Sequence, residues 1–185
     1  LKEFFHFGQN IPEALKHQYD YHENVVVDEV PLFNDYGLQA YAALQETGKY
    51  MLRAIALYLD LDEFYFDDYI QYGNSILRPI HYGPIHDAPK NAVRAGQHED
   101  INLITLLMGA SAEGLEVLDK QNNWIAITAL PNQLVVNVGD MLQRLTNDKL
   151  RSTTHRVVNP PKEQWGTTRF SIPFFLHPAS EMRLD

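Results

Sequence analysis

The chain has 185 residues, no cysteine and a net charge of −9, and 45% of its residues are apolar against 21% charged. This is the composition of a single globular domain with a real core, and not of a disordered chain. The lack of cysteine excludes disulfides, thiolate metal sites and a cysteine nucleophile, and the excess of acidic residues argues against a nucleic-acid surface.

No segment has the character of a membrane or export signal. The longest apolar runs, such as 101–110, are too short to span a bilayer, and no signal peptide opens the chain. We therefore expect a cytoplasmic enzyme or binding protein, monomeric or homodimeric, whose partner is a small molecule and neither nucleic acid nor membrane.

The first 70 residues predict helices after an extended start. Residues 1–34 are aromatic, interrupted by proline and poorly periodic, which indicates a segment that wraps around other elements. Residues 36–60 predict an amphipathic helix with Gly48 on its apolar stripe, where a small residue permits close packing. That stripe also contains Leu44, Met51, Leu52, Ile55 and Leu59. Residues 62–70 predict a second helix, with Asp62 as its N-cap.

The rest of the chain consists of short β-type runs bounded by turn residues. Seven strands are predicted, at 76–82, 101–108, 115–119, 124–127, 134–138, 155–158 and 169–175. Strands at intervals of roughly ten residues are typical of a β-sandwich or barrel, jelly rolls included. We predict one domain, mainly β with flanking helices, in which 1–72 form an extended and helical part and 73–185 form the β core.

Two histidines and an aspartate stand at the starts of predicted strands. His98 and Asp100 precede the strand 101–108 and, as residues i and i+2, can aim at one point while Glu99 faces away. His155 enters another β-branched run. Separately, these residues are explained as a surface pair and as a satisfied histidine near a turn. Together on adjacent strands they form the facial triad of non-haem Fe(II) oxygenases, which leaves three coordination positions open.

Arg169 and Ser171 are also two residues apart, so a guanidinium and a hydroxyl point together into the predicted barrel. A buried arginine needs an anionic partner, and its planar fork matches a carboxylate. Taken alone, the pair is better explained by an internal salt bridge to one of the 24 acidic residues.

The order of His98-x-Asp100, then His155, then Arg169-x-Ser171 resembles that of the Fe(II)/2-oxoglutarate dioxygenase superfamily. The segments LRPIHYGP (77–84), 102–107, NVGDMLQ (137–143) and THRV (154–157) are similar to its isopenicillin N synthase-like branch. The resemblance covers most of the chain, 77–176 most strongly. It implies a double-stranded β-helix (jelly roll, cupin-like) and an oxidoreductase that uses Fe(II), O₂ and 2-oxoglutarate. Such an enzyme converts 2-oxoglutarate to succinate and CO₂ while it hydroxylates, desaturates or cyclises a small molecule.

Carried over residue by residue, the resemblance implies roles for six side chains. His98, Asp100 and His155 would bind the iron. Arg169 and Ser171 would bind the distal carboxylate of 2-oxoglutarate, and Tyr82 would add a hydroxyl to the same pocket.

The sequence also departs from the family pattern. Ile80 stands where plant members commonly carry an asparagine that contacts the co-substrate, and Gly83-Pro84 replaces a common Pro-Pro. Members are usually longer, so we expect this chain to be incomplete at one or both ends. The other histidines have no partner spacing and are expected in surface or packing roles: His6, His17, His22, His81, His86 and His177.

Two alternatives remain open. One is an oxidase of the same fold that uses Fe(II) and O₂ without 2-oxoglutarate, as isopenicillin N synthase does, since that enzyme shares the Arg-x-Ser motif. The other is a non-catalytic jelly-roll binding module, against which the intact triad argues. A zinc hydrolase would need a general base beside the metal, and the sequence supplies no obvious one.

Overall fold

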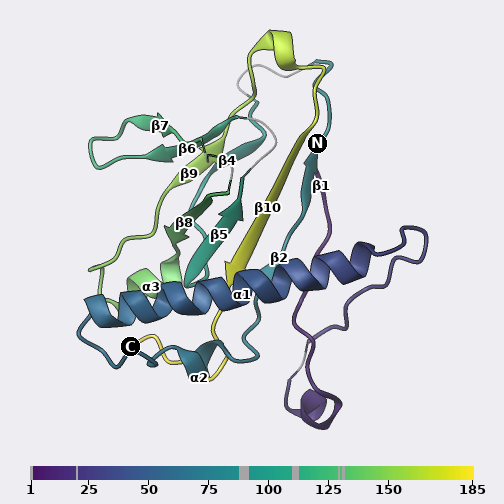
Figure 1. Ribbon diagram of the computed structural model, residues 1–185. Coiled ribbons are helices and arrows are strands. Elements are labelled where there is room, and N and C mark those ends of the chain that lie inside the picture. The colour runs from purple at the N-terminus through teal and green to yellow at the C-terminus, as the bar shows by residue number, and fades with distance from the viewer. Residues whose placement is uncertain (1, 20, 88–91, 110–112, 129, 131) are drawn as a thin grey trace.

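The computed structural model describes residues 2–19, 21–87, 92–109, 113–128, 130 and 132–185, and consists of two antiparallel sheets with helices at one end (Figure 1). The larger sheet has the order β1-β3-β10-β5-β8, with β2 also paired to β10, and the smaller has the order β4-β9-β6-β7. The strands are β1 (Lys2–Phe4), β2 (Ile76–Leu77), β3 (Ile80–Tyr82), β4 (Ala95–His98), β5 (Ile104–Met108), β6 (Leu115–Leu118), β7 (Trp124–Ala126), β8 (Leu134–Val138), β9 (His155–Val157) and β10 (Arg169–Leu176). The prediction of a jelly roll, mainly β with flanking helices, is confirmed.

The long helix α1 (Phe33–Tyr58) runs across the end of the larger sheet (Figure 1) and packs against β10 and β5. Gly48 makes this packing possible, because a Cβ there would lie 2.9 Å from Leu176 Cδ2 and 3.3 Å from Leu106 Cδ1. The buried stripe is Tyr41, Leu44, Gly48, Leu52 and Ala56. Met51, predicted on the stripe, is 38% exposed, so that part of the prediction is wrong.

The shorter helical segments differ from the prediction. Helix α2 covers only Asp67–Ile70, and Asp62 closes a local turn instead, accepting a hydrogen bond from the Phe64 N–H at 2.8 Å. Helix α3 (Asp140–Leu145) was not predicted. Two 3-10 helices, η1 (Glu13–Gln18) and η2 (Lys162–Gln164), lie in the connections. Among the described helices, none is both long and apolar enough to cross a membrane.

The start of the N-terminal segment packs along the larger sheet. β1 pairs with β3, and Phe7, which is buried, forms an isolated bridge with Leu77. Main-chain hydrogen bonds in both directions between these two residues, each 2.9 Å long, fix the segment in place. The first residues of the chain are therefore part of the sheet that carries the central strands.

Most predicted strands end within a residue or two of the observed ones, with two exceptions. The run 76–82 is divided into β2 and β3 by Arg78-Pro79, because proline has no N–H for a sheet ladder. The run 101–108 begins only at Ile104, and it is preceded by the unpredicted strand β4, whose sequence AGQH contains no β-branched residue.

A cavity of about 110 Å³ lies between the two sheets and is lined by both. Alternation along the strands places every second side chain in it. On β10, Arg169, Ser171, Pro173 and Phe175 line the cavity. The alternate residues Phe174 and Leu176 belong to the apolar core that α1 covers. The larger sheet thus has one face committed to packing and one to the cavity.

Candidate metal centre and carboxylate pocket

The structure brings His98, Asp100 and His155 together at the cavity wall. One ligand atom from each lies within 4.8 Å of the others, the histidine ring centroids are 4.3 Å apart, and His155 Nε2 is 3.8 Å from Asp100 Oδ1. His98 ends β4 and His155 begins β9, and the two residues are directly opposite in this antiparallel pair. The two histidines lie on adjacent strands, but His98 belongs to β4 and not to the strand 101–108 at whose entrance it was predicted.

The predicted origin of the His98–Asp100 geometry is wrong. The two residues do not share a strand, because β4 ends at His98 and the chain then crosses from the smaller sheet to β5 in the larger one. Asp100 is fixed in that crossing by the start of α3, where the Asp140 N–H donates to the Asp100 carbonyl at 2.8 Å. Met141 N–H likewise donates to the Ile101 carbonyl at 3.0 Å. The site forms where the chain passes between the sheets.

Hydrogen bonds orient all three side chains. His98 Nδ1 lies 2.8 Å from the Gly96 carbonyl and His155 Nδ1 lies 2.9 Å from the Thr153 carbonyl. Because a carbonyl only accepts, each Nδ1 carries a proton, and in the neutral imidazole this leaves Nε2 with its lone pair. This arrangement is typical of histidines that bind metals.

Asp100 is held in the same way. Its Oδ2 accepts hydrogen bonds from Thr105 Oγ1 at 2.7 Å and from Asn137 Nδ2 at 2.9 Å, which leaves Oδ1 on the side of His155. The carboxylate is 7% exposed. Burial of a charged group with its second oxygen directed at two imidazole nitrogens is costly unless a cation completes the site.

The sequence analysis missed the two residues that hold Asp100. Thr105 lies on β5 and Asn137 on β8, and these positions are paired in the ladder. The available signal was a polar residue at an inward position of an otherwise apolar strand. Gly139 was missed as well: a Cβ at this position would lie 2.2 Å from the Asn102 carbonyl, so only glycine lets the start of α3 approach the crossing.

This set of donors fits a divalent transition metal. Two neutral imidazole nitrogens and one carboxylate oxygen on one side of a cavity, with no thiolate, suit Fe(II) and leave open coordination positions. The three side chains and the hydrogen bonds that fix them would hold the ion without rearrangement of the fold.

The other predicted residues lie together in the same cavity. Arg169 is opposite Tyr82 in the β10–β3 pair, and Ser171 is opposite Ile80. Arg169 is 1% exposed, and its guanidinium carbon lies 5.3 Å from the centroid of the Tyr82 ring. The apolar Ile80, at 9% exposed, supplies no amide to this pocket.

The electrostatics of this pocket favour an anion. Burial lowers the pKa of Arg169, the nearby Tyr82 raises it and the second cation Arg94 lowers it further, but an arginine stays charged in proteins. Burial raises the pKa of Tyr82, so its hydroxyl keeps its proton at neutral pH. A guanidinium and two hydroxyls therefore converge in a largely apolar setting, which matches the needs of a carboxylate.

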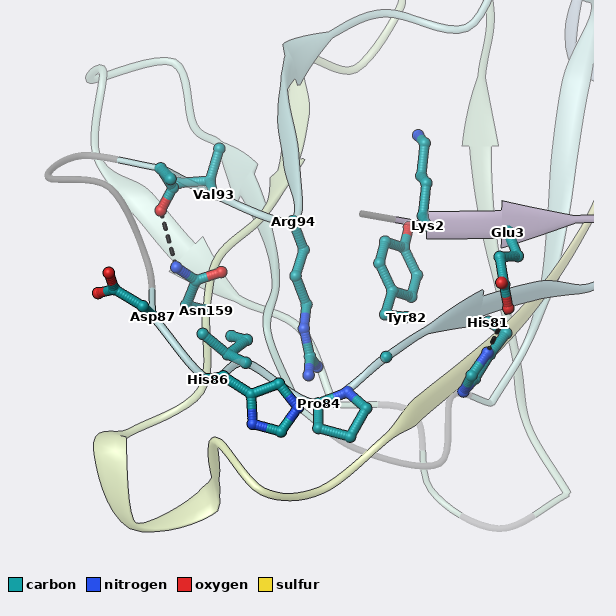
Figure 2. Close-up of a pocket in the computed structure, with 13 residues that line it drawn as sticks. Lys2, Glu3, His81, Tyr82, Pro84, His86, Asp87, Val93, Arg94 and Asn159 are labelled. Atoms are coloured by element: carbon teal, nitrogen blue, oxygen red, sulfur yellow. Dashed lines mark hydrogen bonds and ion pairs between the residues drawn. The ribbon is translucent and has the colours of Figure 1, made fainter.

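A second, larger pocket of about 530 Å³ lies outside Tyr82, which lines both pockets (Figure 2). Figure 2 shows Arg94 extending from the start of β4 beside the Tyr82 ring, with its guanidinium carbon 5.8 Å from the ring centroid. His81 contacts Glu3 at 3.0 Å on the far side. His81 and His86 line this outer pocket, and none of the six histidines expected in surface or packing roles lines the inner cavity.

A jelly roll with a His-Asp-His cluster and a buried arginine in one cavity defines a class, the non-haem metal oxygenases, and comparisons with known proteins name the family. Residues 73–178 match the 2OG-Fe(II) oxygenase superfamily. A putative 2OG-Fe(II) oxygenase family protein from Caulobacter crescentus has 47% identity and a TM-score of 0.92 over 100% of this chain and 60% of that one. The protein belongs to the 2OG-Fe(II) oxygenase superfamily.

Two further relatives are similar over most of the chain. A full-length protein from Neurospora crassa, solved in complex with alpha-KG and thymine, has 33% identity and a TM-score of 0.84 over 98% of this chain and 55% of that one. A 2-oxoglutarate-Fe(II) type oxidoreductase, ppzC, from Metarhizium majus is 38% identical over 157 residues, which are 80% of this chain and 41% of the relative. The chain thus spans less than two thirds of the length of each of these relatives.

Proposed function

We propose that the protein is an Fe(II)- and 2-oxoglutarate-dependent dioxygenase that oxidises a small molecule and converts 2-oxoglutarate to succinate. The observation that carries this proposal is the sharing of one cavity by two unlike sites. The His98, Asp100 and His155 cluster lines it together with the carboxylate pocket of Arg169. A binding module would have no need for a metal centre beside a carboxylate pocket.

In this proposal, the two histidines would bind iron through Nε2 and Asp100 through Oδ1. Bound Fe(II) would supply the reactivity toward O₂ and the one-electron transfers that no side chain of this cavity can provide. Thr105 and Asn137 hold Asp100 in place, so the ligands need no reorganisation when the ion enters.

Arg169, Ser171 and Tyr82 would bind the distal carboxylate of 2-oxoglutarate. The guanidinium provides a fork for the two oxygens, and the two hydroxyls provide further donors. Anchoring this end of the co-substrate directs its keto acid end toward the three metal ligands, which line the same cavity. The apolar side chains of the cavity exclude water from the reacting groups.

We also propose a small molecule as the prime substrate of a single domain, residues 1–185, acting as a monomer or homodimer in the cytoplasm. A net charge of −9 supports this choice over nucleic acid. The cavity lies between two sheets, which suits a small ligand and not a polymer. Thymine in the complex of the Neurospora relative is a molecule of this size class.

An anaerobic titration tests the proposal. Metal-free protein is titrated first with Fe(II) and then with 2-oxoglutarate, while visible absorption is recorded. We expect one equivalent of Fe(II) to bind and a weak charge-transfer band to develop when 2-oxoglutarate chelates it. His98→Ala is the matched variant for the metal, and the exposed His17→Ala is its control.

Each other result contradicts the proposal in a distinct way. Iron binding without the band, in a protein that still consumes O₂ with a substrate, would indicate the oxidase that needs no 2-oxoglutarate. Absence of iron binding would indicate a non-catalytic binding module.

A further inference from the structure

A second arginine reaches the inner cavity without a role in the metal centre or in the pocket for 2-oxoglutarate. The cavity is lined by three cationic side chains, Lys2, Arg78 and Arg169, and by a single carboxylate, Asp100. This is an unusual concentration of positive charge in a protein whose net charge is −9. In the proposed function, Asp100 is committed to the metal and Arg169 to the co-substrate, so one or more cations remain for another ligand.

Arg78 is rigidly positioned. Its Nε–H donates to His6 Nε2 at 2.6 Å, and its guanidinium carbon lies 5.2 Å from the Phe4 ring centroid and 4.9 Å from that of Phe175. Its main-chain N–H donates to the Pro173 carbonyl at 2.9 Å. Burial and the charge of Arg78 lower the pKa of His6, so that ring is neutral and can accept this bond.

The donors of Arg78 are only partly used. Within the described part of the chain, its Nε has a hydrogen-bond partner, and its two terminal amino groups have none. Arg78 lines the same cavity as Asp100. Burial lowers the pKa of Arg78, and the Asp100 carboxylate raises it. Lys2 also lines the cavity, but it is exposed and its compact ammonium offers no planar fork.

The stacking of Arg78 on Phe4 and Phe175 prepares its planar guanidinium to bind a ligand. An arginine held across two aromatic rings has lost most of its conformational freedom before a ligand arrives, so less is lost when it binds. Two terminal N–H donors in one plane match the two oxygens of a carboxylate. The Phe175 ring, which also lines the cavity, provides an apolar surface beside that carboxylate.

We infer that Arg78 is a specificity-determining residue that binds a carboxylate of the prime substrate, so that the enzyme acts on small carboxylic acids. The inference rests on the proposed function, because it assumes that the metal and 2-oxoglutarate occupy Asp100 and Arg169. In this arrangement Arg78, which stacks on Phe4 and Phe175, anchors the acid group, and the remainder of the substrate extends toward the metal ligands.

Binding of matched acids and amides tests the inference without relying on turnover. The protein is loaded with Mn(II) and N-oxalylglycine, a 2-oxoglutarate analogue that is not decarboxylated, and both loading steps are measured by calorimetry. Benzoate, phenylacetate and hexanoate are then titrated against benzamide, phenylacetamide and hexanamide. We expect one or more acids to bind about tenfold more tightly than the amide of the same shape, as is typical of a charge-assisted pair.

Variants of Arg78 distinguish recognition from packing. In Arg78→Met the preference for the acid should fall to about twofold or less, and Arg78→Lys should retain part of it, because the charge remains but the fork is lost. Arg53→Met is the matched control, since Arg53 also stacks on two rings, Tyr50 and Phe64, but on α1 and away from the cavity. It should keep the full preference.

The outcomes separate the two proposals. If Mn(II) and N-oxalylglycine fail to bind, the proposed function is wrong and the inference falls with it. If both bind and every amide binds as well as its acid, or if Arg78→Met and Arg78→Lys retain the wild-type preference, the proposed function stands and the inference alone is overturned.

Discussion

On β10, side chains that face α1 and side chains that face the cavity alternate along one strand, and their chemistry differs. Phe174 and Leu176 are fully buried in the apolar core. Arg169 and Ser171, on the other face, are nearly as buried but polar. Burial of the first pair stabilises the fold, whereas burial of the second pair costs stability and prepares a binding site. The period of two along a strand lets one element serve both purposes.

The same division holds on β5. Leu106 faces the core beneath Gly48, and its neighbour Thr105 faces the cavity and holds Asp100. The division predicts that substitutions on the two faces have separable effects. Changes on the cavity face should reduce metal or co-substrate binding in a folded protein, and changes on the helix face should reduce stability.

The largest effect is expected at the metal centre. Asp100→Ala should abolish iron-dependent conversion of 2-oxoglutarate to succinate, because two histidines alone bind Fe(II) weakly and in no fixed geometry. Metal content and succinate formation are measured together. Asp100→Asn keeps an acceptor oxygen for the donors on Thr105 and Asn137. It should therefore fold like the wild type and still lose turnover, which separates loss of the metal ligand from loss of folding. Asp68→Ala, an exposed carboxylate on α2, is the control. Turnover at the wild-type rate by Asp100→Ala would overturn the site.

The helix face gives the next largest effect. Phe174→Ala should lower the free energy of unfolding by about 3–5 kcal/mol, because it leaves a cavity in the core. Phe174 packs edge-on against Tyr41 at 5.1 Å. Urea denaturation measures the loss, and Phe175→Ala on the cavity face should cost clearly less. Equal losses for these two neighbours would contradict the division between the faces.

Arg169→Met should raise the 2-oxoglutarate concentration needed for half-maximal turnover by about tenfold to a hundredfold. This is the loss of affinity expected when a charge-assisted hydrogen-bonded pair is removed. Metal content should not change, because Arg169 is not among the metal-binding cluster. Co-substrate titrations at saturating iron provide the measurement. An unchanged requirement would remove Arg169 from the carboxylate pocket.

The smallest of these effects is expected at Thr105. Thr105→Val keeps the shape of the side chain but removes the hydroxyl that donates to Asp100. We expect about a tenfold loss of metal affinity, as is usual for groups that orient a ligand. Competition with a chelator measures it. Thr47→Val on the exposed side of α1 should leave affinity unchanged, and if Thr105→Val does so as well, Asn137 alone orients the carboxylate.

Local patterns in the sequence were sufficient for a β-sandwich or barrel and for most strand positions, because alternating residues share a face and turn residues bound each strand. The jelly roll and the six candidate side chains of the site came from the resemblance to a known family. The structure places all six side chains in one cavity.

Tertiary structure decided how those residues meet. His98 and Asp100 converge because the chain crosses between two sheets there. The first turn of α3 donates hydrogen bonds to this crossing, and Gly139 lets α3 approach it closely. The guanidinium of Arg78 is held by Phe4 and His6, which come from the start of the chain. Such contacts depend on the three-dimensional proximity of segments far apart in the chain, which no local periodicity records.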